Sequence, residues 1–388
     1  MSADNFLKLV KKNTVELVGE DSLVDKLKRG KVLRVKLGVD PTSCDLHLGH
    51  SVVLEKLRLF QDFGHIAVLI IGDFTAQIGD PSGRDSERPV LDRTTIEKNA
   101  RTYTEQAFKI LNRERTEIKY NSEWLADFIG KGEFFRVAKN ITLSRLIERD
   151  DFSERISAGL AISLLELLYP VFQGFDSVAV KADVEIGGSD QLFNLLVGRD
   201  IQKIYSLPSQ TVITMPLLPG TDGVKKMSKT SGNYIALNDS PKDIFGKIMS
   251  ISDDLMLEYY RLFTDKDIKT IQRKHPMDAK KDIAFSITAK YCGRQEANLA
   301  QRHFEKVFSR KQLPDEMSEF NLERAMNLSA LLFESGMTKS KNEARRLILQ
   351  GAVKMNEKKV KDDVLVEPGD FVLRVGRRHF KKIKGRKR

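Results

Sequence analysis

Apolar and polar positions in the first half of the chain follow two alternating spacings. Residues 32–39 and the uninterrupted apolar run 66–71 predict strands, the second of them buried on both faces of a sheet. Between them, residues 47–63 carry apolar side chains at helical spacing, and Gly64 stands just past the expected helix end. Strands that alternate with helices predict an α/β fold with a Rossmann-like, doubly wound parallel sheet.

Further elements of this sheet follow along the chain. Thr94 and Glu97 have the spacing of a capping box, which would open a helix running to about Leu111. Short apolar runs at residues 184–186 and 211–215 predict two more strands.

The pattern becomes helical after about residue 241. Ser240 and Pro241 predict a helix start, because serine caps a helix and proline suits its first turn. Helical spacing continues to about residue 309, with breaks near Pro276 and Gly293. Residues 311–321 form a polar, proline-containing stretch that we expect to be a linker.

The last sixty or so residues predict a separate small α+β unit. Ser340 and Glu343 predict a capped short helix that ends at Gly351, followed by strands at residues 352–355, 358–360 and 371–375. We therefore expect a sheet domain over residues 1–238, a helical domain over 239–320 and a small C-terminal domain over 326–388.

Composition narrows the class of protein. The chain has 388 residues, of which 41% are hydrophobic, yet it contains no apolar run long enough to span a membrane and no secretory signal at its N-terminus. Its two cysteines, Cys44 and Cys292, make neither a disulfide framework nor a four-cysteine metal site. We expect a cytoplasmic protein without a structural metal.

Charge points to a polyanionic partner. The formal net charge is +11, and residues 374–388 contain nine Lys or Arg and no Asp or Glu. Such a basic end suits nucleic-acid phosphates, although a disordered solubilising tail is the alternative.

The sequence His47-Leu48-Gly49-His50 follows the first predicted strand and opens a helix. Its histidines share one face of the first turn, where free backbone N–H groups and the helix dipole favour phosphate, and Gly49 permits close approach. Two ordinary surface histidines are the alternative. Cys44 lies close to both histidines in sequence, but no fourth ligand lies near, so we expect no zinc.

The sequence Lys226-Met227-Ser228-Lys229-Thr230 lies in a glycine-flanked loop. Its lysines could close over a triphosphate and neutralise the departing pyrophosphate. In isolation the motif would be a solvated lysine loop. Together with the histidine motif, in this order, it is typical of class I aminoacyl-tRNA synthetases.

Two further sets of polar residues stand out. Tyr169, Gln173 and Asp176 form one helical stripe in an apolar run, where they need polar partners, although Pro170 is awkward for a regular helix. A bound amino acid would supply those partners; a surface stripe or an internal hydrogen-bond network would also explain them. The sequence GGSDQ, residues 187–191, could approach a ribose or form a plain tight turn.

Together these residues resemble the bacterial tyrosyl-tRNA synthetases, in the subgroup whose lysine loop reads KMSKS. The similarity runs through most of the chain, in the segments LGVDPTSCDLHLGH, LIIGDFTAQIGDPSGR, YPVFQGFDSV, EIGGSDQ and DGVKKMSKTSGNY. The helical domain would then bind tRNA, and the C-terminal unit resembles the S4-type RNA-binding domain of these enzymes.

The resemblance implies a role for each candidate residue. The tyrosine substrate would be held by Asp80, Tyr169 and Gln173 at its ammonium, by Asp176 at its hydroxyl and by Gln191 near its carboxylate. The residues at ATP would be Gly38, Asp40, Thr42, His47, Gly49 and His50 at the phosphates, Gly188 and Asp190 at the ribose, and Lys226, Met227, Ser228, Lys229 and Thr230 in the pyrophosphate loop. Of these, His47, His50, Lys226, Lys229 and Thr230 would be catalytic. RNA would be bound by Arg345, Arg346, Arg377, Arg378, Lys381 and Lys382.

Two positions depart from the family pattern. Many members carry a second tyrosine that binds the substrate hydroxyl, and here that position is Lys36. Another position, glutamine in those members, is Glu185. Both departures concern the amino-acid pocket and leave the ATP motifs intact.

The resemblance implies a two-step reaction. ATP, with Mg²⁺, would activate L-tyrosine as tyrosyl-adenylate, and the tyrosyl group would pass to the 3′ end of tRNA(Tyr), in a homodimer. The alternatives are a tryptophanyl-tRNA synthetase, a nucleotidyltransferase with a similar histidine motif, and a synthetase-derived RNA-binding protein without catalysis.

Overall fold

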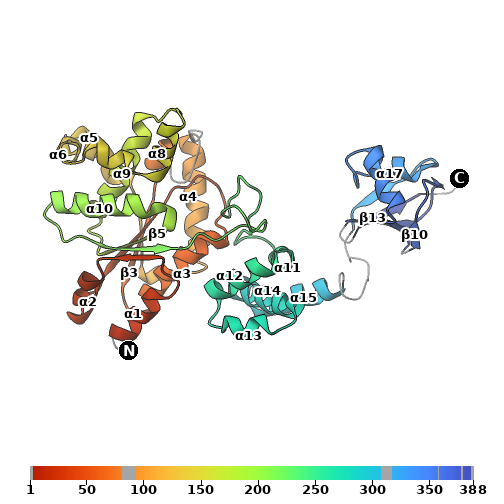
Figure 1. Ribbon diagram of the computed structural model, residues 1–388, viewed down its shortest axis with the longest axis horizontal. Helices are drawn as coiled ribbons and strands as arrows, with labels where there is room; N and C mark the ends of the chain where they lie inside the picture. Colours follow the sequence, from red (N-terminus) through yellow and green to blue (C-terminus); the bar gives the residue numbers. More distant parts are fainter. Residues whose placement is uncertain (1–2, 81–91, 307–316, 357, 377–378, 386–388) are drawn as a thin grey trace. The chain divides into compact units, whose positions relative to one another are not determined.

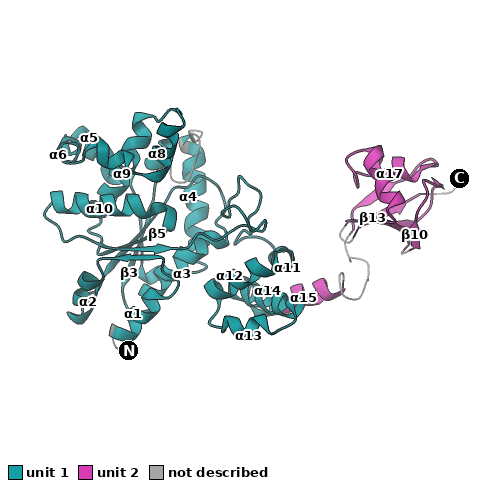
Figure 2. Cartoon of the chain, in the orientation of Figure 1, with its two compact units in different colours: residues 1–297 teal, residues 298–388 magenta. Residues whose placement is uncertain are grey.

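The computed structural model describes residues 3–80, 92–306, 317–356, 358–376 and 379–385. The chain divides into two compact units, Met1–Ala297 and Asn298–Arg388 (Figure 2).

A six-stranded sheet in the order β1-β6-β5-β2-β3-β4 organises the first unit. Its strands are β1 Glu16–Val18, β2 Arg34–Val39, β3 Ile66–Ile71, β4 Thr116–Tyr120, β5 Val184–Gly188 and β6 Thr211–Met215. All neighbours pair in parallel except β1, which is antiparallel to β6. The chain adds strands outward from β2 to β4 and then returns to the other side of β2 with β5 and β6. The order thus reverses between β2 and β5, which is where such sheets bind ligands at the carboxyl ends of their strands.

Helices cover both faces of this sheet. Helices α9 and α10 lie on one face and α1 and α3 on the other (Figure 1). The helices of the unit are α1 Ala3–Lys11, α2 Glu20–Lys28, α3 Leu48–Asp62, α4 Arg93–Ala107, α5 Ser122–Gly130, α6 Glu133–Ala138, α7 Leu143–Ile147, α8 Asp150–Ser157, α9 Leu164–Ala179, α10 Leu192–Ile204, α11 Pro241–Met249, α12 Asp253–Phe263, α13 Ile268–Gln272 and α14 Pro276–Cys292. The predicted doubly wound α/β fold is confirmed.

Local signals were right for some elements and wrong for others. β3 has the predicted bounds, and α11 begins after Ser240, whose side chain accepts a hydrogen bond from the amide of Asp243. The predicted capping box of α4 is wrong, because Asp92 caps the helix by accepting from the amide of Thr95. Thr94 therefore lies inside the first turn.

The last part of the helical region is α15, Arg294–Phe304. Among the described residues, no helix is both long enough and apolar enough to cross a membrane.

The second unit contains a five-stranded sheet in the order β10-β9-β12-β13-β7. Its strands and helices are β7 Glu319–Asn321, β8 Met326–Asn327, α16 Leu328–Glu334, α17 Lys341–Leu349, β9 Val353–Met355, β10 Lys358–Val360, β11 Leu365–Val366, β12 Phe371–Val375 and β13 His379–Lys384. Leu328, Leu331, Ile348, Leu373 and Ile383 pack in its core. The predicted small α+β unit is confirmed.

Two strands of this five-stranded sheet, β7 and β13, were not predicted, and neither were β8 and β11, which pair with each other. β7 pairs in parallel with β13, so residues 319–321 belong to a sheet and the expectation of a linker is wrong for them. β13, with the sequence HFKKIK, fully buries only Ile383, so its pattern lacks the alternation typical of a strand.

Candidate active site

The histidine motif forms the first turn of α3, directly beyond β2. His47 is the N-cap residue, and its Nδ1 accepts a hydrogen bond from the amide of Gly49 at 3.2 Å. Nδ1 of His50 accepts from the amide of His47, also at 3.2 Å. A Cβ on residue 49 would lie 2.9 Å from the His47 ring, so only glycine fits without a shift. Because each Nδ1 accepts, each Nε2 is left to donate.

Both imidazoles are neutral near pH 7. Burial, together with the nearby His50 and Lys226, lowers the pKa of His47 to about 2. Burial and Lys226 lower the pKa of His50 to about 4. The histidines can therefore offer hydrogen bonds to phosphate oxygens without carrying a positive charge themselves.

The lysine loop lies against this turn. The amide of Leu48 donates to the carbonyl of Ile235 at 3.0 Å, so the chain just after the loop is bonded to the start of α3. Lys229 Nζ lies 3.0 Å from Cys44 Sγ and 3.6 Å from Asp45 Oδ2, beside the histidine motif. Met227 is buried, whereas Ser228 is half-buried and Thr230 is exposed.

The GGSDQ segment joins the same place from β5. Lys226 Nζ lies 2.9 Å from Asp190 Oδ2. A Cβ on Gly188 would lie 2.6 Å from Asp190 Oδ1, which explains glycine there. Gly38, at the end of β2, has no atom within 4 Å of an added Cβ and so faces open space. The structure thus brings three separately predicted motifs together at the reversal of strand order.

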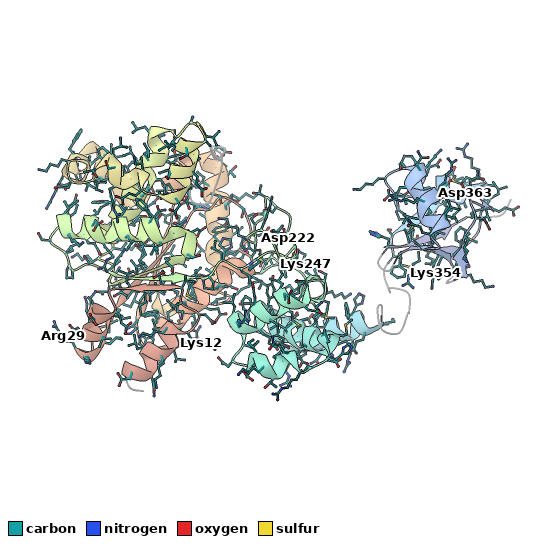
Figure 3. All side chains as sticks on the ribbon, in the orientation of Figure 1. Lys12, Arg29, Asp222, Lys247, Lys354 and Asp363 are labelled. Atoms are coloured by element: carbon teal, nitrogen blue, oxygen red, sulfur yellow. The ribbon has the colours of Figure 1, made fainter. Side chains whose placement is uncertain are left out.

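Asn233 holds the lysine loop in shape, and the sequence analysis missed it. Its Nδ2 donates to Asp222 Oδ2 at 2.9 Å and lies 3.3 Å from the carbonyls of Lys225 and Lys226. Its Oδ1 accepts from the amide of Ser228 at 2.9 Å. Asp222, labelled in Figure 3, also accepts from the loop amides. The available signal was an asparagine beside glycine within the loop motif.

The residues of α9 that are predicted to bind the tyrosine substrate contact the loop after β2 and the start of α10. The helix continues through Pro170. Tyr169 Oη donates to Asp40 Oδ2 at 3.0 Å, and Gln173 Oε1 accepts from Asn194 Nδ2 at 2.9 Å. Tyr169 and Gln173 therefore have protein partners, as an internal hydrogen-bond network would provide.

Asn194 connects this stripe to Gln191 and Asp80, which are also predicted to bind the tyrosine substrate. Its Nδ2 also lies 3.1 Å from Gln191 Oε1, and Gln191 Nε2 donates to Asp80 Oδ2 at 2.8 Å. Arg149 Nη1 in turn donates to Asn194 Oδ1 at 3.1 Å. Neither was predicted: Asn194 contacts the predicted residues Gln173 and Gln191, and Arg149 contacts Asn194 in turn.

Asp176 occupies the deep end of the stripe. Trp124 Nε1 donates to its Oδ1 at 2.7 Å, and Asn121 Nδ2 lies 3.4 Å from its Oδ2. Burial raises the pKa of Asp176 to about 7, against the opposing charge of Lys36 and the two hydrogen bonds. Trp124 and Asn121 lie more than fifty residues away in sequence, so no local motif revealed them.

A shared network connects Asp40 to this end of the pocket. Thr75 Oγ1 donates to Asp40 Oδ1 at 2.8 Å and itself accepts a hydrogen bond from Asn121 Nδ2 at 3.1 Å. The amide of Thr42 donates to the carbonyl of Asp40 at 2.8 Å, which shapes the loop after β2. A Cβ on Gly72 would lie 2.0 Å from Asp40 Oδ1, so this arrangement requires glycine.

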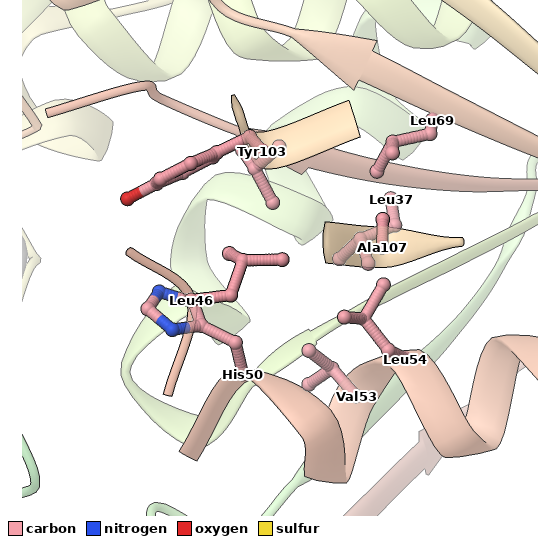
Figure 4. Close-up of a pocket in the computed structure, with 9 residues that line it drawn as sticks. Leu37, Leu46, His50, Val53, Leu54, Leu69, Tyr103 and Ala107 are labelled. Carbon is pink, nitrogen blue, oxygen red and sulfur yellow. The ribbon is translucent and has the colours of Figure 1, made fainter. Parts of the chain in front are cut away.

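Helix α4 supports the loop that precedes the histidine motif. Gln106 Nε2 donates to the carbonyl of Cys44 at 2.8 Å, and its Oε1 accepts from the amide of Leu46 at 2.8 Å. Asn99 donates to the carbonyl of Pro41 at 2.9 Å. Behind His50, an apolar pocket lies between α3, α4 and the sheet (Figure 4). Apart from His50 itself and Tyr103, the residues that line it are aliphatic, so apolar side chains pack behind the imidazole.

Among the described residues, no group of three or more His, Cys, Asp or Glu side chains is arranged to hold a metal ion.

The predicted RNA-binding residues of the second unit have different surroundings. Arg345 and Arg346 are exposed on α17, with Arg345 Nε 3.6 Å from Asp363. Lys381 donates to the carbonyl of Ser335, and Lys382 Nζ lies 4.0 Å from Glu319. Arg377 and Arg378 lie outside the described residues.

Comparison with known proteins follows the same division of the chain. Residues 28–309 match the family described as tRNA synthetases class I (W and Y), and residues 326–372 match the S4 domain. The first match covers tyrosine and tryptophan enzymes together. The chain is 50% identical to the tyrosine–tRNA ligase of Thermotoga maritima, over 99% of this chain and 98% of the relative. It is 47% identical to the tyrosine–tRNA ligase of Aquifex aeolicus, over 99% of both chains.

The chain belongs to the tyrosine–tRNA ligase family. It is therefore a class I aminoacyl-tRNA synthetase, and the alternatives of a tryptophan enzyme, a nucleotidyltransferase and a non-catalytic RNA-binding protein are not favoured. Solved structures agree on the fold. Mitochondrial tyrosyl-tRNA synthetase of Coccidioides posadasii has a TM-score of 0.62 at 26% identity, covering 77% of this chain and 90% of that one. Plasmodium falciparum tryptophanyl-tRNA synthetase has a TM-score of 0.58 at 17% identity, covering 78% and 89%. Fold alone therefore does not separate the two amino acids, whereas identity over the whole chain does.

Proposed function

We propose that this tyrosine–tRNA ligase forms tyrosyl-adenylate in the crevice between β2 and β5 and transfers the tyrosyl group to tRNA(Tyr). The observation that carries the assignment of the site is the convergence of the histidine motif, the lysine loop and the GGSDQ segment where strand order reverses. Ligands of doubly wound sheets bind at this place.

The first step needs positioning and charge stabilisation, and no protein nucleophile. The tyrosine carboxylate attacks the α-phosphate, the bond to the β-phosphate breaks, and pyrophosphate leaves. Neutral His47 and His50 would donate Nε2–H to phosphate oxygens, and Lys226 and Lys229 would supply the positive charge. Thr230 and the backbone of residues 227 and 228 belong to the same loop and would contact the departing pyrophosphate. ATP would enter with Mg²⁺ held by its phosphate oxygens.

Lys226 has a second partner in this scheme. It now pairs with Asp190, the residue proposed to bind the ribose, and it would exchange that carboxylate for phosphate when ATP binds. Release of Asp190 would at the same time make its carboxylate available to the ribose hydroxyls. Binding of the two ends of the nucleotide would thereby be coupled.

The tyrosine substrate would be recognised at both ends. Its ammonium would lie among Asp80, Tyr169 and Gln173, and its carboxylate near Gln191. Its hydroxyl would reach Asp176, whose oxygens already accept from Trp124 and Asn121. A carboxylate with two fixed donors has acceptor capacity left for one phenolic O–H.

The second unit would bind tRNA through phosphate contacts, with exposed Arg345 and Arg346 of α17 as candidates. Arg377, Arg378, Lys381 and Lys382 remain proposals for the same role. We propose domain limits of 1–238, 239–320 and 326–388 and a cytoplasmic location.

A homodimer is also proposed. Several large apolar side chains between residues 129 and 165 are exposed, among them Phe135 at 72% exposure and Leu164 at 71%. Exposed apolar side chains of this size suit burial against a second copy. Analytical ultracentrifugation of the wild type and of Leu164→Asp checks this: the wild type should be dimeric and the variant should dissociate more readily.

The experiment that tests the function is amino-acid-dependent ATP–pyrophosphate exchange, run with tyrosine, phenylalanine and tryptophan separately. Exchange with tyrosine alone is the expected result. Exchange with tryptophan would overturn the assignment of the pocket, and absence of exchange from folded protein would overturn adenylate formation.

A further inference from the structure

The two positions that depart from the family pattern are in contact. Lys36 of β2 and Glu185 of β5 are direct register partners in the two parallel strands that flank the reversal of strand order. Lys36 Nζ lies 2.7 Å from Glu185 Oε1, and the two side chains are 0% and 1% exposed. The tyrosine and glutamine expected at these positions are therefore replaced jointly by an ion pair.

This ion pair is bonded to the helix that carries the tyrosine-binding stripe. Lys36 Nζ donates to the carbonyl of Gln173 at 2.9 Å and to Ser177 Oγ at 2.8 Å. Ser177 Oγ donates to Glu185 Oε2 at 2.9 Å. Gln210 Nε2, from the residue before β6, donates to the same carboxylate oxygen.

We propose that Lys36 and Glu185 act as a positioning pair for tyrosine recognition, anchoring α9 to the centre of the sheet and balancing the charge on Asp176. This inference rests on the proposed role of Asp176 at the substrate hydroxyl. The lysine does not replace the hydroxyl contact of the missing tyrosine, because its fully buried ammonium donates to the carbonyl of Gln173 and to Ser177 Oγ and forms an ion pair with Glu185.

Stability alone does not account for a buried ion pair here. Removing two charges from water is costly, and well-packed apolar residues of similar volume are often at least as stabilising. Apolar residues at positions 36 and 185 would, however, leave the carbonyl of Gln173 and the hydroxyl of Ser177 without these partners. It would also remove both charges that act on Asp176.

The two members of the pair act on Asp176 with opposite sign. The groups that act on its carboxylate are the charges of Lys36 from β2 and Glu185 from β5 and the hydrogen bonds from Trp124 of α5 and Asn121 of the preceding turn. The charge of Lys36 lowers the pKa of Asp176, and the charge of Glu185 raises it. An ionised carboxylate is a stronger acceptor for the phenolic hydroxyl than a protonated carboxyl group, so each charge should move the pH at which strong tyrosine recognition begins.

The test is the pH profile of kcat/KM for tyrosine in ATP–pyrophosphate exchange, measured on the full chain. Lys36→Met should move the acid limb of the profile to higher pH, and Glu185→Gln should move it to lower pH. The double variant should return the midpoint toward that of the wild type. Lys56→Met is the matched control, because it removes another buried lysine, on α3, whose ammonium donates to the carbonyls of Leu9, Val10 and Lys12 rather than to residues of the tyrosine pocket. It should lower Tm and leave the midpoint unchanged.

The outcomes separate the two proposals. Equal losses at every pH in all pocket variants, with one common midpoint, would show that the pair is merely structural and overturn the inference. If wild-type protein fails to activate tyrosine, the proposed function fails instead. If either single variant does not fold, the double variant decides: it should raise the KM for tyrosine on the order of tenfold and leave the KM for ATP unchanged. An unchanged KM for tyrosine would also overturn the inference.

Discussion

Asp176 illustrates how a single buried carboxylate can separate two substrates that differ by one hydroxyl. Its two oxygens accept from Trp124 and Asn121, and the remaining acceptor capacity suits the phenolic hydroxyl of tyrosine. Phenylalanine would leave a buried charge without that partner, which costs on the order of 1–3 kcal/mol or more. Selectivity is therefore expected to depend on the ionised form of this one residue.

The pH dependence of selectivity follows with a definite sign. Burial raises the pKa of Asp176 to about 7, so its ionised fraction rises as pH increases through that value. The ratio of kcat/KM for tyrosine to that for phenylalanine should accordingly be larger at pH 8 than at pH 6. Asp176→Asn should lower this ratio at pH 8 by about tenfold or more and abolish its pH dependence. A ratio that stays constant with pH in the wild type would contradict this role.

The sequence predicted the residues of this site unevenly. Motif residues such as His47, Lys226 and Asp190 were predicted because their short spacings and neighbouring glycines are typical of binding sites. Trp124 and Asn194 were not, since their function arises from contacts across the fold rather than from local pattern. Lys36 was noted only as a departure from the tyrosine of the family pattern, and the strand register then showed that Glu185 is its partner.

At the level of elements, α4 acts as a support for the loop that presents the histidine motif. Its side chains bond to backbone groups of residues 41–46, which belong to neither a helix nor a strand. The position of the phosphate-binding turn thus depends on a helix that contributes no predicted ATP ligand.

Replacing Gln106 tests this support. Gln106→Leu removes both hydrogen bonds to the loop and should raise the KM for ATP on the order of tenfold, with little change in the KM for tyrosine. The exposed neighbour variant Glu105→Ala is the control and should leave both values unchanged. Equal effects of the two variants in pyrophosphate exchange would argue against the support.

The lysine loop depends on Asn233 in the same way. Asn233→Ala leaves the amide of Ser228 and the side chain of Asp222 without their shared partner, so the loop should lose its shape. We expect kcat for pyrophosphate exchange to fall by about tenfold or more, since charge stabilisation of the leaving group requires placed lysines. Asn238→Ala, at an exposed position beyond the loop, should be silent in the same assay.

Elements were predictable where their own residues determine them. The apolar run of β3 and the capping serine of α11 gave correct starts. Helices α5 to α8, β7 and β13 were missed, because short elements with mixed polarity are stabilised mainly by the rest of the fold. The same reason explains why β7 was taken for the end of a linker.

At the scale of the whole molecule, catalysis of adenylate formation is expected to be separable from tRNA binding. All residues proposed for ATP and tyrosine lie in the first unit, and the S4 domain lies in the second. Because β7 belongs to the second sheet, a truncation has to precede it.

Truncation after Lys306 should therefore preserve tyrosine activation and weaken aminoacylation by about a hundredfold or more. The full chain should also lose affinity for tRNA steeply as salt increases, because phosphate contacts release counterions. Pyrophosphate exchange and aminoacylation, each measured at two salt concentrations, check both expectations. Parallel loss of the two activities in a folded truncation would contradict the separation.

The ion pair between β2 and β5 also constrains how this pocket can evolve. Either single replacement leaves a buried charge uncompensated, at about 3–5 kcal/mol, which is a large part of the stability of an ordinary domain. A change from Tyr and Gln to Lys and Glu at positions 36 and 185 therefore requires that both residues be replaced almost together, or that other substitutions first stabilise the protein. Positions 36 and 185 are therefore expected to evolve together, and ancestral sequences should carry Tyr with Gln or Lys with Glu and rarely a mixture.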